Sequence, residues 1–144
     1  MLTAEDIMLV RASFAQIIPI KEAAADLFYD RLFEVAPQLR GLFPVDLREQ
    51  KQKLMAMIAS AVMMLNDLDL LVPKAAALGA RHVAYGAESS HYDVVGQVLL
   101  WTLERGLGDA FTPEVRSAWS DVYRVLAAAM QAGAAQLGEM RAAE

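Results

Sequence analysis

Two kinds of side chain in this sequence could do chemistry from the interior of a folded domain. His82 lies four residues after Leu78, on the face of its segment that the periodicity places inward. A neutral imidazole can hold a metal ion through one ring nitrogen while the other nitrogen donates to a backbone carbonyl. A buried histidine is also often no more than a satisfied core residue, so spacing alone leaves both readings open.

Tyr29 and Gln50 are neutral hydrogen-bond donors on faces that should be buried. Tyr29 lies between Phe28 and Phe33 on the inner half of its segment, and Gln50 lies one turn before Leu54. Each could equally be a boundary residue whose polar end reaches water. Taken together, they predict two neutral donors that face one pocket.

Other kinds of chemistry gain no support from the sequence. No second histidine, carboxylate pair or serine shares these inner faces, which disfavours hydrolysis by general acid and base groups. His91, in Ser-Ser-His-Tyr at an expected helix start, is interpreted as a solvated or capping residue rather than a ligand. The absence of cysteine excludes disulfides, thiolate zinc sites and covalent attachment of a cofactor through Cys-x-x-Cys-His.

Length and composition predict one folded domain over residues 1–144. The chain has 144 residues, of which 56% are hydrophobic and 22% charged, and Ala, Leu and Met favour helices. The net charge is -5, with 13 basic residues scattered among 18 acidic ones, so we expect no nucleic acid partner. No apolar run approaches the roughly 18 residues of a membrane span, and the first residues lack a signal-peptide pattern. We therefore expect a cytoplasmic protein without a membrane partner.

The periodicity predicts an all-α architecture of six or seven helices of unequal length and no strands. In the first half, a capping box at Thr3 and Asp6 begins a helix of about 16 residues that ends near Pro19. Pro19 can open a second helix, and a tighter segment follows from Pro37 to Pro44. The next helix has Leu54, Ile58, Ala61, Val62 and Leu65 on its apolar face and ends near Asn66 to Asp69.

The second half predicts three more helices. Pro73 can start a short helix that runs through Tyr85 and ends at Gly86. Residues 91–107 are apolar on nearly all sides and should be largely buried, with Gly106 and Gly108 as breaks. Thr112 and Pro113 start a final helix that reaches about residue 140. Unequal lengths suit a fold with a pocket better than a bundle of matched helices.

Short motifs in a fixed order run through nearly the whole chain. They are Phe-Tyr-Asp-Arg-Leu-Phe at 28 to 33, Pro37 followed by Leu42-Phe43, Glu-Gln-Lys-Gln-Lys-Leu-Met at 49 to 55, Arg-His-Val-Ala-Tyr-Gly at 81 to 86, His-Tyr-Asp-Val-Val-Gly at 91 to 96, Leu-Gly-Asp-Ala-Phe-Thr-Pro-Glu-Val at 107 to 115, and Ala-Trp-Ser-Asp-Val-Tyr at 118 to 123. With these motifs the sequence resembles the bacterial single-domain globins, close to the haem domain of flavohaemoglobins and with some neuroglobin-like character.

The resemblance implies a globin fold of six to eight helices that enclose non-covalent haem b. It assigns His82 as the proximal ligand of the haem iron, Phe43 as the ring stacked on the porphyrin, and Leu54 as the aliphatic side chain over the distal iron. Tyr29 and Gln50 match the distal polar pair. Tyr92 and Val95 fall on the proximal side and the porphyrin edge, and we expect Leu78 to contact the cofactor one turn before His82.

The function implied is reversible binding of dioxygen, and of nitric oxide or carbon monoxide, at a five-coordinate iron for storage, delivery or sensing. Donors from Tyr29 and Gln50 would stabilise the negative charge that dioxygen acquires. One alternative is a nitric oxide dioxygenase re-reduced by a separate reductase, because no flavin or nicotinamide motif is present. A second is a haem-free signalling module, against which His82 and Phe43 argue.

One position departs from the flavohaemoglobin pattern. That branch has a glutamate on its last helix that forms a hydrogen-bonded set with a tyrosine and the proximal histidine, and Ala134 aligns with it. The tyrosine remains as Tyr92. Without the carboxylate, we expect weaker imidazolate character at His82, which weakens the case for oxygen activation.

Overall fold

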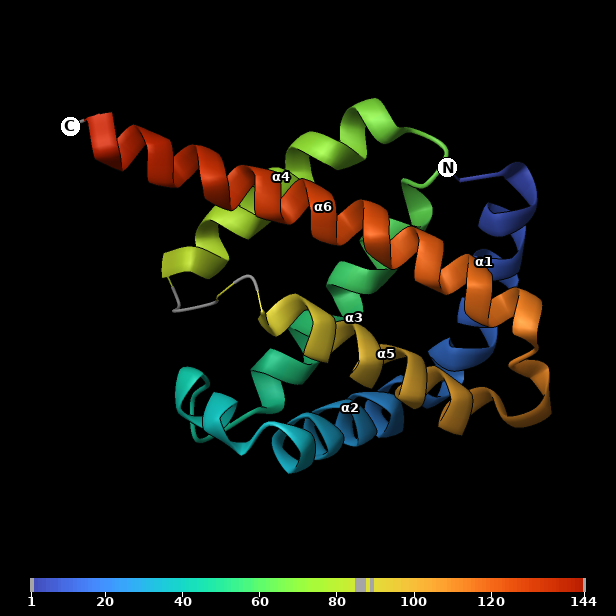
Figure 1. The fold of residues 1–144 in the computed structure, drawn as a ribbon. Helices are drawn as coiled ribbons and strands as arrows, with labels where there is room; N and C mark the ends of the chain where they lie inside the picture. Colours follow the sequence, from blue (N-terminus) through green and yellow to red (C-terminus); the bar gives the residue numbers. More distant parts are fainter. Residues whose placement is uncertain (1, 85–87, 89, 144) are drawn as a thin grey trace.

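The fold is helical throughout the part of the chain that the structure describes. The computed structural model describes residues 2–84, 88 and 90–143, and no strand occurs among them. The elements are α1 Ala4–Ile17, η1 Ile18–Ile20, α2 Lys21–Val35, η2 Pro37–Leu42, α3 Arg48–Met63, α4 Leu68–Ala84, α5 His91–Leu107, η3 Gly108–Ala110 and α6 Pro113–Ala143, where η marks a 3-10 helix (Figure 1). The predicted all-α architecture is confirmed for these residues.

Two helices start with the side-chain caps that the sequence predicts. The Thr3 hydroxyl accepts a hydrogen bond from the backbone nitrogen of Asp6 at 3.0 Å, and the Asp6 carboxylate accepts one from the Thr3 nitrogen at 3.1 Å. At the start of α6, the Thr112 hydroxyl accepts from the Val115 nitrogen at 3.2 Å. These contacts satisfy backbone donors that a helix leaves unpaired in its first turn.

The predicted start of α4 at Pro73 is wrong. The helix already begins at Leu68, and Pro73 lies inside it. Asp67 provides the start, because its carboxylate accepts from the Leu70 nitrogen at 3.3 Å and its carbonyl accepts from the nitrogen of Leu71 at 3.0 Å. A proline this near the beginning removes only one backbone hydrogen bond, so the earlier cap prevails. The predicted end at Tyr85 and Gly86 lies outside the described residues.

The predicted bounds of α5 are confirmed, but its burial is less complete than expected. Gly106 lies within the helix and does not break it, whereas Gly108 ends it with a φ of 57°, a conformation that favours glycine. Gln97 and Glu104, which are seven residues apart and so share one face, are exposed. The helix therefore has a polar outer strip, and its other faces are buried or half-buried.

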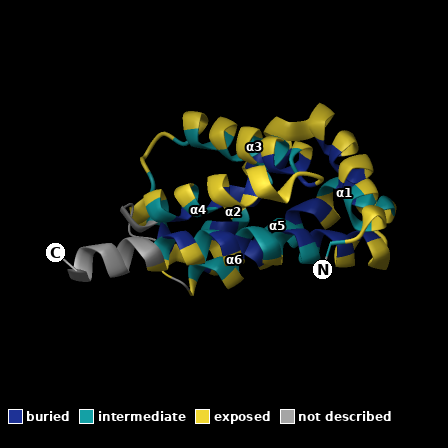
Figure 2. Ribbon diagram, turned by 90° about the horizontal axis from the view of Figure 1, so that it is seen from above, coloured by how far each residue is buried: buried dark blue, intermediate teal, exposed yellow. Residues whose placement is uncertain are grey.

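Helix α5 lies between α2 and α6. Figure 1 shows α2 and α4 at opposite edges of the fold, with α3 and α5 between them and α6 crossing α4. Helix α5 packs against α2 on one side and α6 on the other, while α3 packs against α2 and α1. Seen from above, the buried residues face the interior of this arrangement (Figure 2).

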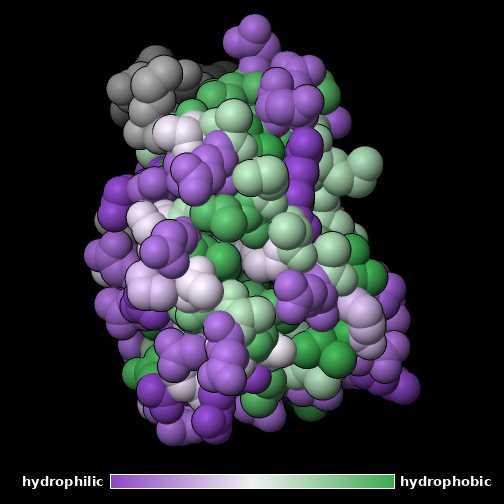
Figure 3. Space-filling model, turned by 90° about the vertical axis from the view of Figure 1, so that its right-hand side faces the viewer, coloured by the Kyte–Doolittle hydropathy of each residue, from purple (hydrophilic) through white to green (hydrophobic). Residues whose placement is uncertain are grey.

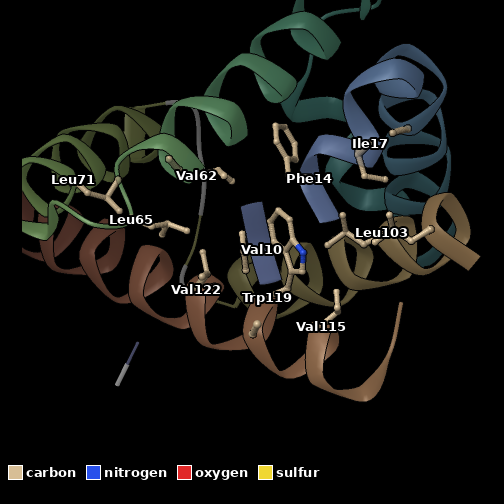
Figure 4. Packing of buried hydrophobic residues seen from close by; sticks show 14 residues of the cluster. Val10, Phe14, Ile17, Val62, Leu65, Leu71, Leu103, Val115, Trp119 and Val122 are labelled. Atoms are coloured by element: carbon tan, nitrogen blue, oxygen red, sulfur yellow. The ribbon is translucent and has the colours of Figure 1, made fainter. Parts of the chain in front are cut away.

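The main core lies where α1, α3, α5 and α6 meet. Trp119 of α6 packs against Phe14 of α1, with ring centroids 6.2 Å apart. The indole nitrogen of Trp119 donates to the Ser13 hydroxyl at 2.8 Å, so the polar atoms in this apolar cluster are paired. Figure 4 labels most of the buried residues of this cluster: Val10, Phe14, Ile17, Val62, Leu65, Leu71, Leu103, Val115, Trp119 and Val122.

Helices α4 and α6 touch through their backbones. A Cβ atom at Gly79 would collide with the backbone carbonyl of Met130, and a Cβ atom at Gly133 would collide with that of Ala76. Glycine at both positions lets the two helices approach more closely than side chains would allow. The helix that contains His82 is therefore seated directly on α6.

Apolar and polar residues are mixed on the surface. The face at the right of Figure 1 shows hydrophobic residues interleaved with hydrophilic ones (Figure 3). Exposed large apolar side chains occur in separate elements, for example Met8 in α1, Met63 at the end of α3 and Val72 in α4. None of the described helices combines the length and apolar character that crossing a membrane requires.

Candidate functional site

Four of the predicted site residues belong to one apolar cluster. Tyr29 of α2, Phe43 after η2, Leu54 of α3 and Val95 of α5 come from distant parts of the sequence. They surround or join the buried side chains of Phe28, Leu32, Ala36, Leu39 and Val98. The fold therefore brings the predicted distal residues together with the predicted porphyrin-stacking ring.

Three ring pairs in this cluster meet edge to face. Phe43 lies with its centroid 5.7 Å from that of Tyr29 and 5.5 Å from that of Phe33. Tyr29 also contacts Phe28 at 5.1 Å between centroids, with the planes almost perpendicular. Such geometries place the positive edge of one ring on the negative face of another. The contacts fix the direction in which the Tyr29 hydroxyl points.

Tyr29 and Gln50 form a direct hydrogen bond between α2 and α3. Nε2 of Gln50 donates to the Tyr29 hydroxyl oxygen over 3.2 Å. Tyr29 is only 3% exposed, and this burial raises the pKa of its phenol, with the Gln50 hydrogen bond acting weakly in the opposite direction. The phenol is thus neutral at physiological pH and keeps its proton as a donor.

An ion pair beside this hydrogen bond also joins α2 to α3. Nζ of Lys51 lies 2.8 Å from the Asp26 carboxylate, with side chains 28% and 59% exposed. Asp26 precedes Tyr29 by three residues and Lys51 follows Gln50, so both contacts hold the first turn of α3 against the same stretch of α2. The position of Gln50 depends on this turn.

The surroundings differ on the two sides of the pair. Gln50 borders a hollow open to solvent, which Pro44, Arg48 and Lys53 also line. On the inner side, a small apolar cavity of about 20 Å³ lies against Leu54 and is lined mainly by Phe14, Ile17, Ala24, Phe28, Met55, Ile58, Leu99 and Leu103. An apolar cavity of this kind stays dry. Gln50 therefore borders solvent, whereas Leu54, one turn later on α3, borders an apolar cavity.

His82 is placed on α4 with a fixed ring orientation. Its Nδ1 lies 2.8 Å from the backbone carbonyl oxygen of Leu78, the residue one turn earlier. A carbonyl can only accept, so Nδ1 bears the proton, and in this tautomer Nε2 is the ring nitrogen that can bind a metal ion. His82 and Leu78 are half-buried, whereas Ala75 and Gly79 are buried. The side of α4 that contains the imidazole is thus turned partly away from α6.

The remaining proximal candidate, Tyr92, lies in the first turn of α5. Its phenol has a pKa raised by burial, and its backbone carbonyl accepts a hydrogen bond from the Tyr123 hydroxyl at 2.6 Å. A Cβ atom at Gly96 would come within 2.6 Å of the Tyr123 ring, so glycine makes room for that ring. Sequence reasoning missed Tyr123, although it ends the motif that begins at Ala118.

Two further sequence interpretations concern Ala134 and His91. Ala134 lies half-buried on α6, next to Gly133 at the crossing with α4. His91 accepts a hydrogen bond from the Glu88 nitrogen at 3.0 Å through Nδ1, and Nε2 lies 4.0 Å from the Glu88 carboxylate. Glu88 precedes α5, so this contact orders the turn before the helix and caps none of the helix's own backbone nitrogens.

Arg40 is a site residue that the sequence reasoning did not identify. Its guanidinium donates to the carbonyl oxygens of Pro44 at 2.9 Å and Val45 at 3.0 Å, and more weakly to that of Phe43 at 3.4 Å. It also lies 5.1 Å from the centroid of the Phe33 ring. The only sequence signal for this role is an arginine three residues before Phe43. The sequence does not show which backbone carbonyls that arginine would bind.

Comparisons with known proteins agree with this arrangement. The family model described as Globin matches residues 26–130. Neuroglobin of Tetraodon nigroviridis is 32% identical over 155 aligned residues, with 98% of both chains covered. Neuroglobin-2 of Oncorhynchus mykiss is also 32% identical, with 96% of both chains covered.

A solved structure has the same fold over the whole chain. It is an engineered carbene transferase made from a candidate nitric oxide dioxygenase of Rhodothermus marinus. The two share 26% sequence identity, the TM-score is 0.82, and the match covers 99% of both chains.

Proposed function

The chain belongs to the globin family, and from that premise we propose that it is a single-domain haem protein that reversibly binds dioxygen and other diatomic gases. Haem supplies the reversible binding of such a gas by its ferrous iron. Globin membership implies the haem, and we propose haem b, held without a covalent bond. The proposed role is storage, delivery or sensing of dioxygen.

The observation on which this proposal rests is the hydrogen bond of the His82 ring to the Leu78 carbonyl. It sets the tautomer in which Nε2 can serve as a metal ligand, and it makes the imidazole a better electron donor. Histidine with this second contact is the usual proximal ligand in globins. We assign His82 as that ligand, with Leu78 packing against the cofactor one turn earlier.

The distal side would be formed by the cluster on α2, α3 and η2. Phe43 would stack on the porphyrin, and Leu54 would lie over the gas site beside the dry cavity. Tyr29 would donate its phenolic proton to the gas ligand, supported by the hydrogen bond from Gln50. An apolar environment strengthens such a donor, because little water competes with it.

On the proximal side, Tyr92 and Val95 would contact the cofactor. The Tyr123 hydroxyl binds the Tyr92 backbone, and Ala134 offers no carboxylate to the imidazole. Without a carboxylate at position 134, the imidazole donates less electron density to the iron, which favours gas binding over the activation of dioxygen. We therefore place reversible binding ahead of catalysis.

A second candidate function is oxidation of nitric oxide to nitrate by dioxygen, with the missing electron supplied by a separate reductase. The structural neighbour from Rhodothermus marinus, described as a candidate nitric oxide dioxygenase, favours it. The two functions would use the same residues. They differ in whether a cellular reductase restores the ferrous state fast enough for turnover.

The absorption spectrum of the purified protein, reduced and then exposed to air, tests the proposal. We expect a Soret band that shifts on oxygenation and returns when dioxygen is removed. His82→Ala should abolish or strongly alter this band. The chain offers a matched control, since His91→Ala removes the one other histidine and should leave the spectrum unchanged.

The outcomes separate the alternatives. A colourless protein that cannot be reconstituted with haem would overturn the proposal in favour of a haem-free signalling module. A spectrum lost in His91→Ala and kept in His82→Ala would show that the ligand is misassigned. Rapid re-reduction by a cellular reductase in the presence of nitric oxide would favour the dioxygenase.

A further inference from the structure

We propose that Arg40 is a positioning residue, which fixes Phe43 and its neighbouring rings in the orientation that retains the cofactor. The inference rests on the proposed function, because it concerns how the haem is held. Arg40 lies in η2, and Phe43 directly follows that helix.

The carbonyl oxygens at the start of the loop after η2 share one donor, the guanidinium of Arg40. Residues 43–47 form no helix or strand between η2 and α3, so their backbone groups have no regular partners. Nη1 of Arg40 donates to Pro44 at 2.9 Å and to Phe43 at 3.4 Å, and Nη2 donates to Val45 at 3.0 Å. The Phe43 nitrogen donates back to the Arg40 carbonyl at 3.2 Å. Three successive carbonyls thus converge on one charged group.

The same guanidinium contacts the aromatic cluster. Its central carbon lies 5.1 Å from the centroid of the Phe33 ring. Phe33 in turn lies 5.5 Å from Phe43 and 6.0 Å from Tyr29, measured between ring centroids. Arg40 therefore holds Phe43 from two directions, through its backbone and through its ring neighbour.

Arginine suits this task better than lysine. Its planar fork can donate to several carbonyls while its face lies on an aromatic ring, and it remains charged at all accessible pH values. A lysine ammonium at the same place could donate to one or two of the carbonyls but could not stack in the same way. The arrangement therefore predicts that Arg40→Lys recovers only part of the effect.

The test compares Arg40→Met and Arg40→Lys with Arg48→Met. Methionine keeps an unbranched apolar stem and removes the charge and the donors. Arg48 is the matched control, because it pairs with Asp46 of the same loop at 2.7 Å in an exposed salt bridge with side chains 88% and 60% exposed. Loss of such an exposed pair should matter little.

Two quantities are measured for each variant. The first is the rate of haem transfer from the loaded protein to an excess of a high-affinity apoglobin acceptor. The second is amide hydrogen exchange of Phe43, whose nitrogen donates to the Arg40 carbonyl, in the haem-free chain, with denaturant unfolding as the measure of global stability. We expect Arg40→Met to speed both processes by about tenfold, since hydrogen bonds from a charged donor are lost. Arg40→Lys should lie between, and Arg48→Met within about twofold of the original chain.

Faster exchange together with faster haem loss, at nearly unchanged global stability, supports the proposal. Unchanged haem loss in Arg40→Met overturns it, even if exchange rises, because Arg40 would then order the loop without serving the cofactor. Equal effects of Arg48→Met and Arg40→Met overturn it too. If the original chain takes up no haem, the proposed function fails, while the exchange rates still decide whether Arg40 fixes the loop.

Discussion

The hydroxyl oxygen of Tyr29 accepts a hydrogen bond from Nε2 of Gln50 over 3.2 Å, and this bond links α2 to the first turn of α3. Because the oxygen already accepts, the phenolic proton is the group that Tyr29 can offer to a ligand. Gln50 polarises that phenol and also lies against the solvent-open hollow. The two residues should therefore make unequal contributions to gas binding.

Tyr29→Phe should release dioxygen about ten to a hundred times faster than the original chain. A hydrogen bond to a ligand with negative charge contributes roughly 1.5 to 3 kcal/mol, and its loss is expressed mainly in the dissociation rate. Stopped-flow displacement of dioxygen measures that rate. Carbon monoxide, which is weakly polarised, should change much less. An unchanged dioxygen rate would rule out the donor role.

Gln50→Leu should have a smaller effect on dioxygen release than Tyr29→Phe. The variant removes the support of the phenol but leaves its proton in place, so the loss is about tenfold or less. The same displacement experiment compares the two variants. A larger effect in Gln50→Leu would mean that the amide, rather than the phenol, contacts the gas.

Lys51→Met should raise the rate at which carbon monoxide binds, by about two- to fivefold. The ion pair with Asp26 holds the turn that contains Gln50, and a partly exposed pair contributes roughly 0.2 to 1 kcal/mol. Flash photolysis at low and high salt measures the rate. High salt should speed binding in the original chain and not in the variant, because the pair is already absent there.

Lys53→Met is the matched control for Lys51→Met. Lys53 pairs with Glu49 at 3.6 Å along one exposed helix face and does not reach α2. Its loss should leave the rate and its salt dependence unchanged. If both variants behaved alike, net charge rather than the link to Asp26 would be the cause.

Gly79→Ala should destabilise the protein by about 1 to 3 kcal/mol, even though alanine favours helices. The new methyl group would collide with the Met130 carbonyl, and a backbone atom cannot rotate away. Denaturant unfolding of the haem-free chain measures the loss. Gly41→Ala is the control, since nothing lies within 4 Å of its Cβ position, and it should be neutral or slightly stabilising.

Tyr123→Phe should make stability less sensitive to alkali. Burial raises the pKa of Tyr123 well above its ordinary value of 10.0, and the neighbouring charges of Tyr92 and Asp93 raise it further. The folded chain therefore keeps a proton that the unfolded chain loses above about pH 10, so unfolding becomes easier as pH rises beyond that point. The variant lacks this contribution. Below pH 10 it should be less stable by about 1 kcal/mol, because the bond to the Tyr92 carbonyl is gone.

Urea unfolding at a series of pH values checks the Tyr123 prediction. The stability curves of the two proteins should converge as pH rises above about 10. Parallel curves would mean that the Tyr123 phenol is deprotonated equally in the folded and the unfolded chain. Its burial would then not cause the loss of stability at high pH.

Local signals predicted much of the fold. The bounds of α5 and the cap of α6 at Thr112 follow from periodicity and from side chains that satisfy the first backbone nitrogens. The start of α4 was mispredicted because proline favours a first turn, while the cap at Asp67, six residues before Pro73, is stronger in this chain. The exposed strip of α5 shows that a mostly apolar helix can still turn its few charged residues to water.

The site was predictable only in part. Spacing placed Tyr29 and Gln50 on inner faces, but the hydrogen bond between them depends on how α2 and α3 pack. The role of Arg40 depends on three backbone carbonyls, which look the same in every sequence. The backbone contact at Gly79 depends in the same way on where α6 crosses. Tertiary geometry, rather than residue type, determines these features.

The crossing of α4 and α6 also has a mechanical consequence. Packed helices slide past each other when the side chains between them change rotamer in small steps. At Gly79 and Gly133 the two backbones face each other directly, with no side chains between them that could change rotamer. A displacement of His82 along the axis of α4 would therefore be transmitted directly to the 31-residue helix α6 at the point where the two helices cross.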